Sequence, residues 1–200
     1  GKTTLLDLIL GLISPTSGSI YYDNKISSKK FHSLNKLDIS YVSQNIYLSN
    51  SSIKENILLG NEEKFNKDLF EKSLFSSLVK NFAIKTRRKY NSFVGERGEK
   101  LSGGQRQRVG IARALYNNSN IIVFDEATSA LDNITESKIY QNINKNFKNK
   151  TLIIVTHRIQ TIKNFDQIFV LEKGKLIGKG NYKFLFKNNK YFRDLVNAHE

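Results

Sequence analysis

Four residues at the start of the chain have the types needed to hold a phosphate group. Gly1, Lys2, Thr3 and Thr4 run directly into the apolar residues of a predicted helix. Backbone N–H groups at a helix start attract phosphate, and the lysine of such a loop contacts the β and γ phosphates of a nucleotide. The hydroxyl of Thr3 would bind Mg²⁺, and Thr4 would reach the α phosphate. Because the earlier glycines of such a loop are absent from the chain, a chance match stays open for this pattern alone.

Two adjacent carboxylates follow an apolar run later in the chain. Residues 121–124 are Ile-Ile-Val-Phe, and Asp125 and Glu126 come directly after them. In open α/β sheets, ligands bind at the carboxyl ends of the strands. We therefore expect Asp125 to hold Mg²⁺ through a water molecule and Glu126 to polarise the water that attacks a γ phosphate. The alternative is a pair of solvated carboxylates, which the phosphate-binding pattern at residues 1–4 makes less favourable.

A second helix start suited to phosphate lies at residues 102–105. Ser102 and Gln105 have the spacing of a capping box, which predicts a helix over residues 106–116. Gly103 and Gly104 let an anion approach the exposed N–H groups of that helix. Two such helix starts in one chain indicate that a nucleotide is held between two copies.

Strands and helices must position these residues, and their pattern predicts an α/β protein. Apolar runs without polar alternation, at 121–124, 152–155 and 168–171, are typical of parallel strands that are buried on both faces. Earlier strands are expected at 19–22 and 39–42, the first closed into a hairpin by Asp23 and Asn24. Helical patterns cover 53–90, 135–147, 159–163 and 182–196, and a tight turn covers 172–175.

The combined motifs resemble those of the nucleotide-binding domain of ABC transporters. Residues 101–105, Leu-Ser-Gly-Gly-Gln, match the family signature, residues 121–126 match its Walker B strand, and residues 129–132 match its D-loop. Gln44 falls at the Q-loop position and His157 at the switch-histidine position. The resemblance covers essentially all 200 residues. It implies a P-loop NTPase with a mostly parallel sheet, a small antiparallel β portion and a helical sub-domain at about 50–115.

The resemblance also implies a role for each candidate residue. Two domains would close head to tail on two ATP molecules. Each ATP would contact Gly1, Lys2, Thr3 and Thr4 of one copy and Ser102, Gly103, Gly104 and Gln105 of the other. The remaining roles are catalysis by Glu126, His157 and Gln44, Mg²⁺ binding by Thr3, Gln44 and Asp125, and dimer contact or coupling by Asp132 and Glu96.

Within the family, residues 94–98 resemble the X-loop of exporters, so we expect an ATPase that drives export. A transmembrane domain would lie upstream or on a partner chain, which places this domain on the cytoplasmic face of the membrane. The first alternative is a soluble ABC-type ATPase acting on DNA or ribosomes. The second is a module that holds ATP without hydrolysing it. Departures from the common family pattern, at Ser43, Thr156 and Asn181, remove no catalytic group.

Composition sets further bounds on function. The chain has no cysteine, which excludes a disulfide scaffold and a thiolate zinc site. The net charge of +14 comes largely from dispersed lysines, so we expect no nucleic-acid partner, and attraction to acidic lipids is a secondary reading. No apolar run approaches the ~20 residues of a membrane helix. The chain opens on Gly1, from which we expect a domain cut within the Walker A motif and lacking its N-terminal strands.

Overall fold

The computed structural model describes residues 1–22, 25–27 and 38–198. The chain divides into two compact units, one formed by residues 38–154 and the other by residues 1–37 and 155–200. The expected turn at Asp23 and Asn24 lies outside the described residues.

The unit of residues 38–154, called the central unit below, contains a three-stranded sheet. Its strands lie in the order β3 (Ile39–Val42), β4 (Ile121–Asp125) and β5 (Thr151–Val155). β3 and β4 run parallel, with Ile39 opposite Ile121 and Val42 opposite Phe124. Ile122, Val123 and Phe124 are fully buried, as the uninterrupted apolar run predicted. The apolar run at 152–155 predicted a strand buried on both faces, but β5 is only partly buried along its length.

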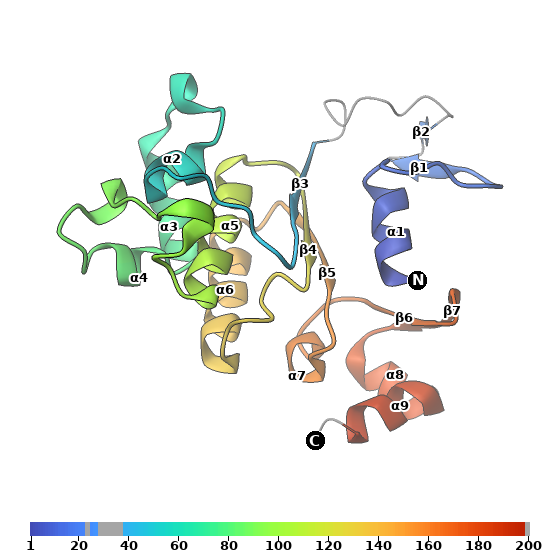
Figure 1. Ribbon diagram of the computed structural model, residues 1–200. Helices are drawn as coiled ribbons and strands as arrows, with labels where there is room; N and C mark the ends of the chain where they lie inside the picture. Colours follow the sequence, from blue (N-terminus) through green and yellow to red (C-terminus); the bar gives the residue numbers. More distant parts are fainter. Residues whose placement is uncertain (23–24, 28–37, 199–200) are drawn as a thin grey trace. The chain divides into compact units, whose positions relative to one another are not determined.

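Helices occupy the rest of this unit (Figure 1). They are α2 (Ile53–Leu58), α3 (Lys67–Ser76), α4 (Lys80–Ala83), α5 (Gly103–Tyr116) and α6 (Asn133–Asn146), with short 3₁₀ turns at Glu62–Lys64, Lys89–Asn91 and Glu96–Gly98. The helical pattern at 53–90 is therefore several short helices. They share a buried core with α5 that includes Ile57, Phe70, Leu74, Val109 and Tyr116.

A buried asparagine ties the segment before α2 to the helices. Asn56 has no exposed surface, and its amide group donates to the Ser49 carbonyl oxygen at 3.1 Å and to the Ser51 hydroxyl at 3.0 Å. Its side-chain oxygen accepts from the Ser49 backbone N–H at 3.0 Å. Arg113 of α5 donates to the Asn56 carbonyl oxygen at 2.7 Å, and its burial lowers its pKa. These bonds fix the chain that follows Gln44 against α5.

The other unit contains two antiparallel strand pairs and four helices within its described residues. β1 (Ile20–Tyr22) pairs with β2 (Lys25–Ser27), and β6 (Ile168–Glu172) pairs with β7 (Lys175–Gly180). The helices are α1 (Lys2–Ile9), α7 (Ile159–Ile162), α8 (Tyr182–Asn188) and α9 (Lys190–Asn197). Leu185, Phe192 and Val196 of the last two helices pack with Ile168 and Val170.

Two expectations for this unit were wrong. The run at 168–171 is not a parallel strand buried on both faces, because β6 pairs antiparallel with β7 and Phe169 is 55% exposed. The single helix expected at 182–196 is two helices. Asn189 adopts an extended conformation between them, and its side chain caps α9 at the Phe192 N–H and donates to the Ile177 carbonyl oxygen. An asparagine that satisfies these groups makes a helix end favourable.

Among the described residues, none of the helices combines the length and the apolar composition that a membrane-spanning segment requires.

Candidate functional site

The carboxyl ends of two neighbouring strands bring the catalytic candidates of the central unit together. Val42 and Phe124 are opposite each other in the parallel pair, and Gln44 and Glu126 each follow two residues later. The Nε2 atom of Gln44 donates to Oε2 of Glu126 at 3.1 Å. Two residues that are 82 positions apart in sequence thus share one edge of the sheet, where ligands of α/β proteins bind.

Asp125 stands beside this pair and has its own hydrogen-bond donor. The hydroxyl of Tyr41 donates to Oδ2 of Asp125 at 3.1 Å. Tyr41 was not among the predicted site residues, because a tyrosine in a strand is usually explained by packing alone. Its position in the last residues of a strand that ends near Gln44 is the one signal that pointed to it.

The donor set at this edge suits a hard cation. Carboxylate and amide carbonyl oxygens, which Asp125 and Gln44 supply, are groups that Mg²⁺ accepts as ligands. Among the residues that the structure describes, no three His, Cys, Asp or Glu side chains form a metal-binding group. An ion at Asp125 and Gln44 therefore needs further ligands of another kind, such as water, hydroxyl or phosphate oxygens.

Glu126 begins a tight turn with an unusual backbone. Its φ angle is 50°, in the left-handed region that residues other than glycine seldom adopt. The Ser129 N–H donates to the Glu126 carbonyl oxygen at 3.0 Å, and the Leu131 N–H donates to the Thr128 carbonyl oxygen at 3.0 Å. Such strained residues are common at active sites, where the surrounding contacts hold them in place.

The turn is fastened to α6 at two points. The buried Thr128 hydroxyl donates to the buried carboxylate of Glu136. Asp132 is the N-cap of α6 and accepts from both the backbone N–H and the hydroxyl of Thr135, at 2.8 and 2.7 Å. The hydroxyl bond, followed by the backbone bond, lowers the pKa of Asp132. The residue predicted for coupling therefore also has a local structural role.

Ser102 starts α5 with the predicted capping box. Its hydroxyl accepts from the Gln105 N–H at 3.2 Å, and its own N–H donates to Oε1 of Gln105 at 2.9 Å. Gly103 and Gly104 lie against the turn after Glu126: a Cβ atom added to Gly104 would be 3.0 Å from the Ala130 carbonyl oxygen. The helix start therefore packs directly on the turn that follows Glu126.

Residues 95–98 form a tight loop just before this helix start. Gly95 has φ 79°, and a Cβ atom there would meet the Glu99 side chain at 2.7 Å. Glu96 is exposed in the same loop. Its predicted role in coupling stays a prediction.

The other candidates lie in the second unit. Gly1 is the N-cap of α1, Lys2 is partly buried, and Thr3 and Thr4 are exposed in the first turn. His157 is exposed just beyond the end of β5. That they lie close to Asp125 and Glu126, which belong to the other compact unit, stays a prediction.

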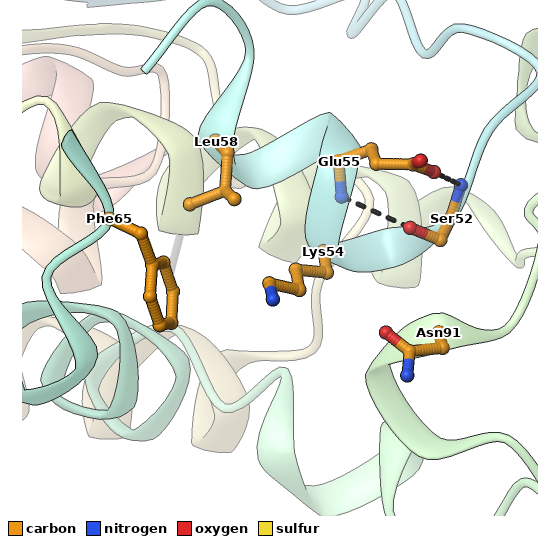
Figure 2. Close-up of a pocket in the computed structure, with 6 residues that line it drawn as sticks. All are labelled: Ser52, Lys54, Glu55, Leu58, Phe65 and Asn91. Carbon is orange, nitrogen blue, oxygen red and sulfur yellow. Dashed lines mark hydrogen bonds between the residues drawn. The ribbon is translucent and has the colours of Figure 1, made fainter. Parts of the chain in front are cut away.

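A pocket of about 340 Å³ lies elsewhere in the central unit and contains none of the predicted site residues. Figure 2 shows the capping box of Ser52 and Glu55 at its edge, with Lys54 and Phe65 facing each other. The Lys54 ammonium is 4.5 Å from the centre of the Phe65 ring. The polar groups here cap a helix or stack on an aromatic ring, so this pocket is not the candidate site.

Comparison with known proteins gives concordant results. The chain is 43% identical over 188 residues to an ATP-dependent lipid A-core flippase of Wigglesworthia glossinidia brevipalpis, covering 94% of this chain and 32% of that protein. It is 40% identical over 199 residues to the β-(1→2)glucan export ATP-binding/permease protein NdvA of Bartonella quintana (strain Toulouse), covering 99% of this chain and 33% of that protein. The chain thus spans only 32–33% of the length of these relatives.

A solved structure gives the same result. A bacterial Atm1-family ABC exporter with ATP bound matches with a TM-score of 0.92 and 31% identity, over 99% of this chain and 35% of that one. The family model described as ABC transporter matches residues 1–129, which include the predicted phosphate-binding residues 1–4, residues 101–105 and the Asp125–Glu126 pair. The chain belongs to the ABC transporter family.

Proposed function

We propose that this chain is the ATP-binding and ATP-hydrolysing part of an ABC-type exporter. The observation that carries the proposal is the 3.1 Å hydrogen bond from Gln44 to Glu126 at the strand edge beside Asp125. It joins a residue suited to a metal ion with the carboxylate suited to activating water. Family membership supports the same reading, and the names of the two relatives describe a flippase and an export protein.

Each site residue takes a definite role in this proposal. Lys2, Thr3 and Thr4 at the start of α1 bind the phosphates of ATP, and Thr3 also contributes its hydroxyl to the metal site. Gln44 is a further ligand of Mg²⁺, and Asp125 holds the ion through a water molecule; the ion, when bound, would neutralise charge on the phosphates.

Hydrolysis then depends on residues that hold and deprotonate water. Glu126 accepts a proton from the attacking water, and the bond from Gln44 fixes the orientation of its carboxylate. His157 contacts the γ phosphate, where an imidazole can donate a hydrogen bond to the oxygen that gains charge.

A second copy of the domain completes the site. Ser102, Gly103 and Gly104 of one copy face the ATP that is held by the other, since N–H groups at a helix start bind anions. Gln105 holds the backbone N–H of Ser102 and so keeps the helix start in shape. Asp132 and Glu96 contribute to the contact with the other copy and with a transmembrane domain, which places the chain at the cytoplasmic face of the membrane.

The alternative of a soluble ATPase on DNA or ribosomes is less favoured, because the named relatives are a flippase and an export protein. Cell fractionation separates the two functions. An exporter subunit stays in the membrane fraction after a high-salt wash, whereas recovery with ribosomes or nucleoids would contradict the export assignment.

Replacement of Glu126 by glutamine tests the chemistry. In the full-length protein, Glu126→Gln should lower ATP hydrolysis on the order of 10²-fold or more, since loss of a general base has that effect. Glu63→Gln is the matched control, because Glu63 is exposed in the 3₁₀ turn at Glu62–Lys64. Phosphate release that is unchanged in Glu126→Gln would contradict the proposal and favour a module that holds ATP without hydrolysing it.

A further inference from the structure

Three consecutive side chains of α5 reach three different segments of the central unit. Arg106 donates to the Leu101 carbonyl oxygen at 2.7 Å, just before the helix, and Arg108 donates to the Leu78 carbonyl oxygen at 3.3 Å, between α3 and α4. Gln107, between them, points to the turn after Glu126. Successive helix residues are about 100° apart around the axis, which explains why each finds a different neighbour.

Gln107 holds that turn with both ends of its amide group. Its Oε1 atom accepts from the Ala130 backbone N–H at 2.9 Å, and its Nε2 atom donates to the Ser129 hydroxyl at 3.0 Å. The residue is only 4% exposed. Because the amide is planar and both of its ends bind adjacent residues, it fixes the distance and the orientation of the turn relative to α5. Burial strengthens both hydrogen bonds.

The turn that Gln107 holds is the one that carries the catalytic candidate. The Ser129 N–H donates to the carbonyl oxygen of Glu126, so a shift of Ser129 moves the backbone of Glu126 directly. On the other side, Gly104 packs on the Ala130 carbonyl oxygen, and Gln107 lies one helical turn after it. The start of α5 and the turn of Glu126 are therefore joined by direct packing at Gly104 and by the two hydrogen bonds of Gln107.

We infer that Gln107 is a positioning residue for ATP hydrolysis, which holds the start of α5 and the Glu126 turn in one fixed relation. The inference rests on the proposed ATPase function. In that function the start of α5 contacts the ATP of the other copy, so binding there is transmitted through Gln107 to the segment of the carboxylate that activates water. Gln107 itself contacts neither ATP nor water.

Replacement by methionine tests this role, since methionine has a similar length but forms neither hydrogen bond. In the full-length protein, Gln107→Met should lower kcat for ATP about tenfold or more, because small displacements of catalytic groups have large effects on rate. The KM for ATP should change less than about twofold, since Lys2, Thr3 and Thr4 are untouched. Gln141→Met, at an exposed position of α6, is the matched control and should keep both constants.

A second variant keeps the inference testable if Gln107→Met folds poorly. Ser129 is exposed, so Ser129→Ala should fold normally and still remove one of the two bonds. We expect it to lower kcat by a smaller factor, and to have no added effect in the Gln107→Met background, because coupled residues are not additive. Ser129→Thr keeps the hydroxyl and should restore the rate.

The outcomes separate the inference from the proposed function. If kcat per folded molecule stays within about twofold of wild type in both Gln107→Met and Ser129→Ala, Gln107 has no positioning role. Losses that multiply in the double variant would also overturn it. If the unaltered protein shows no hydrolysis that depends on Glu126, the proposed function itself fails, whatever the Gln107 variants do.

Discussion

Asn56 offers a sharp test of how the chain between Gln44 and α2 is held. Asn56→Ala removes the amide that binds the Ser49 and Ser51 groups, in a position with no exposed surface. Alanine cannot replace any of these bonds. We expect the segment to open far more easily than in the unaltered protein.

The size of the effect follows from which groups lose a partner. The Ser49 N–H, which is partly buried, loses its acceptor, Oδ1 of Asn56, and a shielded N–H left without a partner costs about 1–3 kcal/mol. The Asn56 amide also donates to the Ser49 and Ser52 carbonyl oxygens. Each oxygen keeps a second donor in the variant: the Ser51 N–H for Ser49 and the Asn56 backbone N–H for Ser52. Loss of each of these two bonds should therefore lower the free energy of unfolding by only about 1 kcal/mol. The sum is about 3–5 kcal/mol, a large part of the 5–15 kcal/mol that stabilises a typical domain.

Hydrogen exchange on the intact protein measures this loss where it occurs. Peptides covering residues 47–58 should exchange on the order of 10²- to 10³-fold faster in Asn56→Ala, since each 1.4 kcal/mol of the expected loss is a factor of ten. Asn61→Ala is the control, because the bond from Asn61 to Asn117 is exposed and its loss should change stability by less than about 0.5 kcal/mol. Protection within about threefold of wild type in Asn56→Ala, or equal losses in both variants, would refute the reasoning.

Two further predictions concern the helix starts. Gly104→Ala should lower the free energy of unfolding by about 1–3 kcal/mol and the Tm by several degrees, because the added Cβ would lie 3.0 Å from the Ala130 carbonyl oxygen. Gly103→Ala should leave the Tm nearly unchanged, because its Cβ would lie 3.5 Å from the nearest atom. Equal Tm values for the two variants would show that the turn yields to the added atom. The Ser52 bonds lower the pKa of Glu55 from its usual 4.5, so the capping box stabilises the fold above that pH and loses this effect as the pH falls through the lowered value. In Glu55→Gln the Tm should therefore decrease less as the pH is lowered through this range. The same decrease of Tm with pH in both proteins would show that the Glu55 carboxylate does not stabilise the fold through the capping box.

Local patterns in the sequence predicted local structure well. The Ser102–Gln105 spacing predicted a capping box, and the structure contains it. The apolar run before Asp125 predicted a fully buried strand, because two faces of a central strand must both be apolar. The contact between Gln44 and Glu126 was not among these predictions; it follows from the parallel pairing of β3 with β4, which puts the ends of the two strands side by side.

Features that depend on a distant partner were beyond the sequence. The run at 168–171 looks the same whether its neighbour is parallel or antiparallel, and only pairing with β7 decides this. Asn189 looks like one more polar residue on a helix surface until its amide finds the Ile177 carbonyl oxygen. The hydrogen bonds of Gln107 and Tyr41 likewise join residues 22 and 84 positions apart in the sequence, and the hydrophobic periodicity of a segment does not predict such contacts.

The left-handed backbone at Glu126 means that the residue best for stability differs from the residue that the proposed reaction needs. At φ 50° a glycine fits without steric conflict, and any residue with a Cβ atom is held there at a cost. A library of variants selected only for folding should therefore enrich glycine at position 126, and one selected for turnover should retain glutamate. The fold by itself does not favour a carboxylate at this position, whereas the proposed reaction requires one.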